Sequence, residues 1–235
     1  MRLSVNLPGL APWAVLVLGA ALLQSVPGPP ERAGEWRLLG PVAGTGALPA
    51  AAGGWRAPAA DVLWLRANLA WERRDAVATE TLARAAVALE PEVDYFRINT
   101  ARIIAFDLPE WGLDPTAPAE VARRRRAQHV RRALELLASR PGDSAAVLVE
   151  RARLTHQGLG DSEAAGELFR AAAERPDAPY FAGRLSVELL IRAGRAREAR
   201  EWLRAWLPRL PAGDPEAQRA RMEARLRELD RLIGP

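Results

Sequence analysis

The sequence predicts an all-α protein built from consecutive helix pairs, and three observations lead to this fold class. Prolines recur at Pro58, Pro91, Pro141, Pro176 and Pro211, at intervals of 33, 50, 35 and 35 residues. Each of the last four prolines follows an amphipathic stretch with helical spacing of its apolar residues. A closing proline in units of about 34 residues is typical of stacked helix pairs. A hydrophobic N-terminal segment predicts one further helix.

Composition supports a folded chain and gives little guide to function. Of 235 residues, 49% are apolar and 26% charged, which is a globular composition. The formal net charge is only +4 and all basic side chains are arginines, so charge alone is weak evidence for nucleic-acid binding. The absence of cysteine excludes disulfides, thiolate nucleophiles and cysteine-ligated metals.

Residues 1–26 are predicted to be a signal anchor that crosses a membrane once. No charged side chain lies between Arg2 and Glu31, a run long enough to span a bilayer. A cleaved signal peptide is the alternative, but the exit of the segment has prolines and no A-x-A pattern. Arg2 favours an orientation that puts the rest of the chain outside the cytoplasm, in the periplasm of a bacterial inner membrane. Residues 27–58, rich in Pro, Gly and Ala, are expected to be a linker.

Residues 59–235 are predicted to hold four helix pairs and a cap helix. The first unit has a turn at Arg74 and Asp75 that lacks glycine and is about one residue short. The second unit is longer than the others, with a first helix to about Phe106, an insertion at residues 107–117 and a long second helix. The last stretch, from Asp214 to Ile233, begins with an aspartate N-cap and a proline, as expected for the terminal cap.

Two units carry specific marks. Residues 160–172 (GDSEAAGELFRAA) and 193–203 (AGRAREAREWL) each have a glycine at the predicted turn and small residues in the helix that follows the turn. In them Ala165, Ala172 and Ala199 fall where two helices approach closely, and Phe169 and Leu203 fall where a large side chain fills the space between units.

These marks resemble the tetratricopeptide-repeat superfamily, of which the chain is identified as a divergent bacterial member. The resemblance implies a right-handed superhelical array that binds a protein or peptide and is not an enzyme, with no cofactor and no metal. In this family the ligand lies in a concave groove lined by the first helix of each unit. Trp206 stands where the family has a small residue, which suggests a wider last layer.

Carrying the family's groove positions over to this sequence nominates nine residues. Ordinary solvated helix polarity is an equally good explanation of these side chains. Asparagine bonds a peptide backbone as both donor and acceptor, which favours Asn68 and Asn99 as clamps. The nine candidates are Asn68, Trp71, Asn99, Ile103, Glu150, Gln157, Arg184, Glu188 and Arg192.

A second candidate surface is the arginine run in the long second unit. It comprises Arg123, Arg124, Arg125, Arg126, Arg131 and Arg132. Behind it Ala127, Val130, Leu134 and Leu137 define a buried stripe, so the helix is expected to overhang the core beside the insertion. A solvated, overlong helix explains the run most simply. The functional alternative is a patch for an acidic partner, an anionic polymer or a lipid surface, with nucleic acid disfavoured outside the cytoplasm.

Other features point less clearly to function. Trp111 in the insertion is either a partner anchor or a side chain packed back on its own scaffold, and packing is favoured. His129 and His156 match no metal-ligand spacing, and no hydrolase or nucleotide motif occurs. A helical cell-envelope enzyme acting on polysaccharide through paired carboxylates remains a less favoured alternative.

Overall fold

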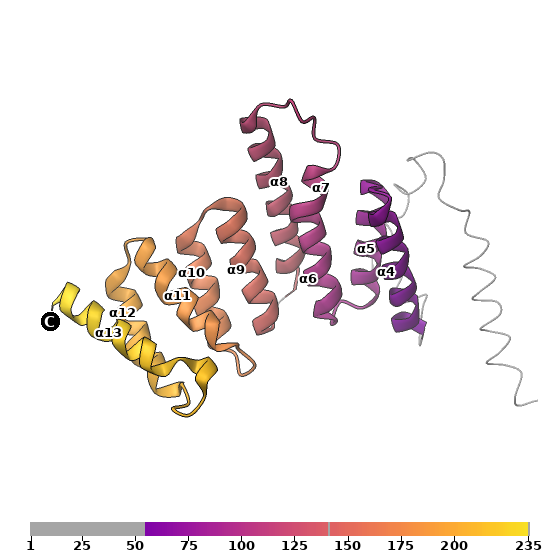
Figure 1. Ribbon diagram of the computed structural model, residues 1–235. Coiled ribbons are helices and arrows are strands. Elements are labelled where there is room, and N and C mark those ends of the chain that lie inside the picture. The colour runs from indigo at the N-terminus through magenta and orange to yellow at the C-terminus, as the bar shows by residue number, and fades with distance from the viewer. Residues whose placement is uncertain (1–54, 141, 235) are drawn as a thin grey trace, which may run out of the picture.

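The computed structural model describes residues 55–140 and 142–234, and within them nine helices pack as consecutive pairs. The all-α prediction is therefore confirmed. The helices stand side by side in chain order from α4 to α13 (Figure 1). The predicted anchor, residues 1–26, and the linker up to residue 54 lie outside the described residues. Among the helices that the structure does describe, none combines the length and the apolar character that a membrane span requires.

The helix pairs follow the predicted units. Within each pair the first helix packs against the second. The second helix then packs against the first helix of the next pair or, in the last pair, against the closing helix. A single helix closes the array. The pairs are α4 (Arg56–Glu72) with α5 (Ala76–Leu89), α6 (Asp94–Arg102) with α8 (Ala119–Ala138), α9 (Ala145–Leu159) with α10 (Ser162–Ala173), and α11 (Tyr180–Arg192) with α12 (Ala196–Trp206); the closing helix is α13 (Arg219–Ile233).

The turn of the first pair has the same form as the turn of the fourth pair. Arg74 adopts a left-handed conformation with φ 55°, at the position where the fourth pair has Gly194 with φ 80°. The next backbone N–H in each turn donates to a carbonyl five residues earlier, Asp75 to Ala70 at 3.0 Å and Arg195 to Leu190 at 2.9 Å. The prediction that the first turn is shorter is wrong, because an arginine takes the glycine position.

Small residues make the close helix contacts. Ala165, Ala172 and Ala199 are fully buried, as expected. Trp206 is also buried, and a Cβ on Gly183 of α11 would lie only 2.2 Å from its ring atom Cζ2. The bulk of this tryptophan is thus accommodated by the missing side chain of the facing glycine.

The first helix of the second pair does not end at Phe106 as predicted. It continues through a π-helical turn, η3 (Ile103–Asp107), into α7 (Leu108–Glu110), so part of the predicted insertion is helical. Within the π turn the Leu108 N–H donates to the Ile103 carbonyl, five residues back. The next bond of that register would need an N–H from Pro109, which proline lacks. Proline is tolerated here because the wider turn absorbs its ring.

The cap helix starts later than expected. Asp214 accepts a hydrogen bond from the Glu216 N–H at 2.8 Å and begins a separate 3-10 turn, η5 (Pro215–Ala217). Gln218 then adopts a left-handed conformation with φ 47°, and α13 begins after it. The helix is broken at this point because the side chain of Ala217 is buried against the fourth pair, which fixes the direction of the 3-10 turn.

The apolar core is divided rather than continuous. The described residues hold three clusters: one across α4 to α8 that reaches Val147 and Leu154, one on α9 to α11, and one on α11 to α13. The join between the second pair and α9 has an apolar part, where Val147 and Leu154 continue the first cluster, and a strongly polar part at the start of α9.

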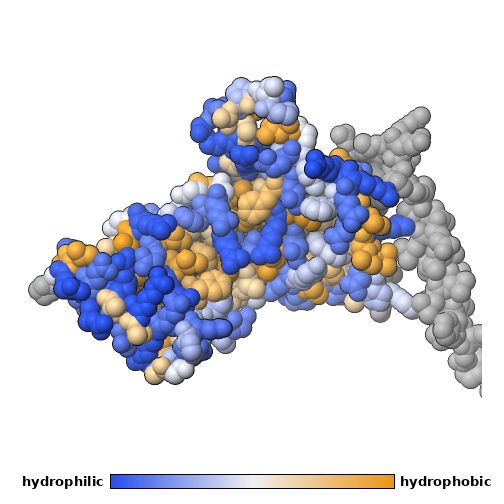
Figure 2. Space-filling view, in the orientation of Figure 1, coloured by the Kyte–Doolittle hydropathy of each residue, from blue (hydrophilic) through white to orange (hydrophobic). Residues whose placement is uncertain are grey.

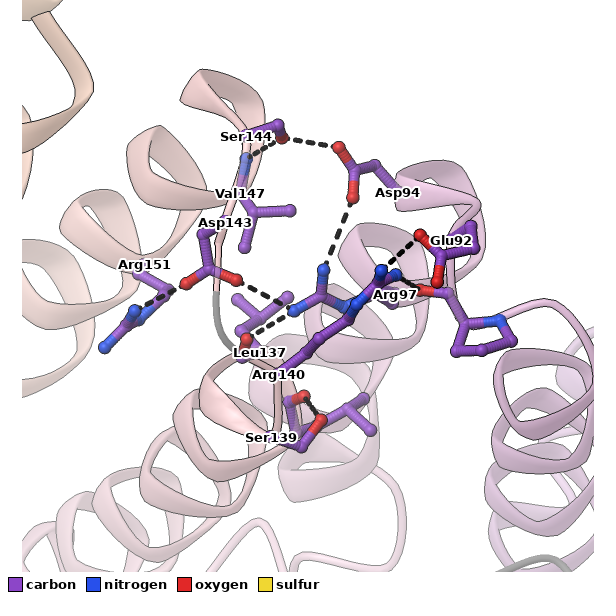
Figure 3. Close-up of polar contacts among 12 residues, drawn as sticks. Glu92, Asp94, Arg97, Leu137, Ser139, Arg140, Asp143, Ser144, Val147 and Arg151 are labelled. Atoms are coloured by element: carbon purple, nitrogen blue, oxygen red, sulfur yellow. Dashed lines mark hydrogen bonds and ion pairs between the residues drawn. The ribbon is translucent and has the colours of Figure 1, made fainter. Parts of the chain in front are cut away.

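The polar join is centred on Arg97 of α6, which is only 4% exposed (Figure 3). Its guanidinium donates to the Leu137 carbonyl at the end of α8 (2.6 Å) and to Oδ1 of Asp143 in the following loop (3.0 Å). Asp94 lies 3.4 Å away on the other side. The second oxygen of Asp143 accepts from Arg151 of α9 at 2.7 Å. One buried carboxylate therefore fixes two arginines from consecutive pairs.

A first prediction concerns the strained turn. Replacing Arg74 by glycine should raise the free energy of unfolding by about 0.5–1 kcal/mol, because glycine enters the left-handed region without steric cost. Urea unfolding of the full chain measures this change in the free energy of unfolding. The matched control is Gly194→Ala, which should lower stability by a similar amount. Equal stability of R74G and the wild type would show that the turn carries no strain.

Candidate functional site

Among the paired helices, the first helices carry most of the exposed large apolar side chains, and Leu232 of the closing helix α13 is exposed as well. Leu65, Leu69, Trp71, Tyr95, Phe106 and Leu185 are exposed on α4, on α6 with its π-helical continuation, and on α11. On the second helices, within the described ranges, only Val77 and Val121 are comparably exposed. We call the exposed side of the first helices the first-helix face. Single exposed apolar side chains are normal on a protein surface. A concentration of them on one side indicates a surface that contacts another molecule.

On α6 the first-helix face is a continuous stripe. Tyr95, Asn99, Arg102 and Phe106 recur every three or four residues, which places them one above another on a helix. The Asn99 amide donates to the Tyr95 carbonyl at 2.8 Å, so its oxygen stays available as an acceptor. Trp64 of α4 packs edge-on against Tyr95 at 5.6 Å between ring centroids, which ties the stripe to the first pair.

Contacts between successive first helices fix the spacing of this face. Arg102 binds Glu150 of α9 through two hydrogen bonds of 2.9 and 2.6 Å. The bond to Glu150 raises the pKa of Arg102 above its usual value. Further along, the guanidinium of Arg153 lies 5.7 Å above the ring of Phe181 on α11. The face is therefore held in one arrangement without a ligand.

Several predicted groove residues are used in these internal contacts. Glu150 is 3% exposed and fully engaged by Arg102. Ile103 is 9% exposed and belongs to the first core cluster, because the π turn directs it inward. Neither offers its side chain to solvent.

The other candidates divide between engaged and exposed side chains. Arg184 donates to the Glu216 carbonyl at 2.7 Å, and desolvation lowers its pKa. Glu188 pairs with Arg225 of α13 at 2.7 Å. Trp71 donates to Oδ2 of Asp107 at 2.8 Å. Asn99 is described above, Asn68 is half-buried on α4, and Gln157 and Arg192 are exposed on α9 and α11.

Trp111 lies against the scaffold. Its ring is 6.2 Å from that of Trp71, and it is half-buried against the first core cluster. Its carbonyl accepts from Arg125 at 2.9 Å. The loop after α7 is thus attached at both its aromatic side chain and its backbone.

The six arginines of α8 do not form one patch. Arg125 and Arg132 point back to the scaffold, where Arg132 pairs with Glu80 of α5. Arg126 binds Glu110 of α7 with contacts of 2.7 and 3.2 Å, and this bond lowers the pKa of Glu110 and raises that of Arg126.

The remaining three arginines are exposed. Arg123 and Arg124 both pair with Glu120, and the side chain of Arg131 has no ion-pair partner in residues 55–234. The predicted basic surface is therefore smaller than six side chains.

His129 of α8 completes the π turn. Its Nδ1 lies 3.1 Å from the Ile104 carbonyl, the acceptor that Pro109 leaves without an N–H in the π register. Because a carbonyl only accepts, Nδ1 carries the proton. Burial lowers the pKa of His129, with smaller contributions in the same direction from Arg132 and Arg125, opposed by this hydrogen bond and by Glu80.

An open cleft lies where α8 extends past the end of α9. Its volume is about 950 Å³, at the upper end of the range of about 300–1,000 Å³ usual for ligand sites. We call it the overhang cleft. In the space-filling view the overhang stands above the array, with apolar surface at its foot (Figure 2). The cleft is lined by Ala105, Phe106 and Glu110, by Ala119, Arg123, Arg124, Arg126, Ala127, Val130 and Arg131, and by residues 157–161.

Comparisons of the chain with models of known families, with curated proteins and with solved structures find no match. Within the described residues no three His, Asp or Glu side chains are grouped so that they would hold a metal ion. What the chain can do must therefore be argued from its surfaces.

The sequence prediction missed Tyr95, Phe106 and Arg153 as members of the first-helix face. Their helical spacing relative to Asn99 and Gln157 was a usable signal. The overhang of α8 was expected from the apolar stripe that begins at Ala127, but the cleft beneath it was not, because its size depends on how far α8 extends beyond α9.

A second prediction concerns His129. Because its pKa is lowered in the folded chain, the unfolded chain binds more protons between that lowered value and about pH 6.5, so stability falls as pH drops through this window. Urea unfolding at pH 7.5 and 5.5 should show this loss in the wild type and a smaller one in His129→Asn, whose amide retains the donor. His156→Asn is the control and should behave as the wild type. The same loss in all three proteins would contradict the assignment.

Proposed function

We propose that this protein is a tetratricopeptide-like scaffold, tethered to the bacterial inner membrane by residues 1–26, that binds a segment of a partner protein outside the cytoplasm. Binding is to the concave groove of a right-handed array, and the protein does no chemistry itself. The observation that carries the proposal is the concentration of exposed apolar side chains on the first helices, with Tyr95 and Phe106 at its centre.

The physical basis is a preformed surface. The bond of Arg102 to Glu150 holds the first helices α6 and α9 together, and the bond of Arg225 to Glu188 holds α11 against the closing helix α13, so a ligand does not have to order them. On α6 and its π-helical continuation, Tyr95 and Phe106 offer large rigid contact areas, and Asn99 offers a free amide oxygen for a backbone N–H.

This interpretation revises the set of ligand-contacting candidates. Asn68, Asn99, Gln157 and Arg192 stay as polar contacts, since their side chains are accessible at least in part. Glu150, Glu188 and Arg184 act instead in the scaffold, where each holds two helices together.

A third prediction tests this surface by cross-linking. A photo-reactive phenylalanine analogue in place of Tyr95 or of Leu185, in the full chain in the cells that make it, should capture the same partner protein. The matched position is Val77, which is as exposed as Leu185 but lies on a second helix. Capture of that partner equally well from Val77, or of unrelated proteins from Tyr95 and Leu185, would contradict the proposal.

A further inference from the structure

The overhang cleft exists because the second pair is longer than its neighbours. α8 has 20 residues whereas α9 has 15 and α10 has 12, so the first turns of α8 extend past the end of the third pair (Figure 1). The wall opposite α8 comes from the π turn and α7. The base comes from the end of α9, where Gly158 allows close approach: a Cβ there would lie 2.5 Å from Val130 Cγ2.

The cleft combines an apolar floor with an arginine wall. Arg123, Ala127 and Arg131 follow one another at four-residue spacing on α8, so they lie on the same side of the helix. Phe106, 42% exposed, and Val130 lie in the same lining. Such a surface suits a ligand with both negative charge and one apolar group.

The arginines of this wall are incompletely neutralised. Arg123 and Arg124 share the single carboxylate of Glu120, and Arg131 has no ion-pair partner among the described residues. An incoming carboxylate can bind Arg131, and a second can bind Arg123 while Arg124 keeps Glu120. Arg–carboxylate bonds of this kind are short, directional and stronger than neutral ones.

We infer that the overhang cleft binds an acidic segment of a partner protein that carries one large apolar side chain, which packs on Phe106, Ala127 and Leu159. The inference rests on the proposed protein-binding function and names the chemistry of the partner. Phe106 belongs to both the cleft and the first-helix face, and Gln157, on the exposed side of α9, also lines the cleft, so one extended segment can occupy the two surfaces together.

A protein segment fits this cleft better than a uniform polyanion or a bilayer. Glu110 and Asp161 lie in the same lining, so a dense row of phosphates or sulfates would be repelled there. A short acidic segment can place its charges at Arg123 and Arg131 alone. The apolar floor contributes binding only to a ligand that has an apolar group.

A fourth prediction tests the inference with defined probes on the full chain in phosphatidylcholine nanodiscs. Three dye-labelled short peptides are compared: acidic residues flanking one Phe, the same with Ala for Phe, and the same Phe flanked by Gln and Ser. Fluorescence anisotropy should show the acidic Phe peptide binding at least about tenfold more tightly than the other two, a difference of about 1.4 kcal/mol. Heparin and phosphatidylglycerol vesicles are added as competitors.

The decisive variant is Arg123→Gln with Arg131→Gln, which should weaken the acidic Phe peptide about tenfold. Its control is Arg197→Gln with Arg227→Gln, two exposed arginines outside the cleft, which should leave binding unchanged. Far-UV circular dichroism checks that both stay folded.

Three results would overturn the inference: no peptide binding, peptide binding unaffected by the Arg123 and Arg131 changes, or heparin or vesicles binding through these arginines in preference to the peptide. In each case capture from Tyr95 still tests the proposed function separately.

Discussion

The arrangement of this array depends on a buried charge contact between its second and third pairs. Arg97 and Asp143, 4% and 6% exposed, meet at 3.0 Å alongside the apolar contacts that Val147 and Leu154 make across the same join. Charges taken out of water are costly unless they are paired and hydrogen-bonded. Here the guanidinium also donates to the Leu137 carbonyl near the end of α8, and the carboxylate also accepts a hydrogen bond from Arg151.

The same contact positions the two surfaces proposed for binding. Ser144 caps α9 by accepting from the Val147 N–H at 3.2 Å, and its hydroxyl donates to Asp94 beside Arg97. The start of α9 is thus fixed against the start of α6. With that end fixed, Arg102 reaches Glu150 about two turns further along, and the far ends of the two helices define the overhang cleft. Because α6 and α9 are tied at two levels, the first-helix face between them is rigid.

The irregular second pair shows how a few residues change a regular repeat. Pro109 would normally end a helix, yet the π turn carries the chain past it and His129 satisfies the Ile104 carbonyl. The helical path that α6 begins therefore continues through η3 and α7 to Glu110, opposite the long helix α8, and the cleft lies between them. The two surfaces proposed for binding therefore meet at Phe106, inside the π turn.

Much of the fold was predictable, and the exceptions have physical causes. Closing prolines and small residues such as Ala165 and Ala199 identify the pairs, because close helix packing restricts which residues fit. Arg74 could not be assigned to a glycine position from its type, since arginine rarely adopts the left-handed backbone that this turn and its hydrogen bonds to Trp71 and Ala70 require. Proline normally signals a helix end, so the predicted end of the first helix in the second pair fell before Pro109, whereas the helical path continues to Glu110.

In the candidate site, the exposed stripe on α6 could be predicted from the helical spacing of its residues. The pairing of Arg102 with Glu150 across 48 residues was not, because no local pattern reports it. The six arginines of α8 lie close together in the sequence. The helix nevertheless directs them to different sides, and only three remain exposed without contact to another helix.

The most direct test of this account is the stability of Arg97→Met, measured by urea unfolding of the full chain beside Arg140→Met. Arg140 lies in the same cluster but pairs with the exposed Glu92 and is itself 37% exposed (Figure 3). We expect Arg97→Met to lower the free energy of unfolding by about 3–5 kcal/mol, because it leaves Asp143 buried with one partner fewer. Arg140→Met should cost less than about 1 kcal/mol. Equal losses in the two variants, or none in Arg97→Met, would contradict the central role of the buried pair.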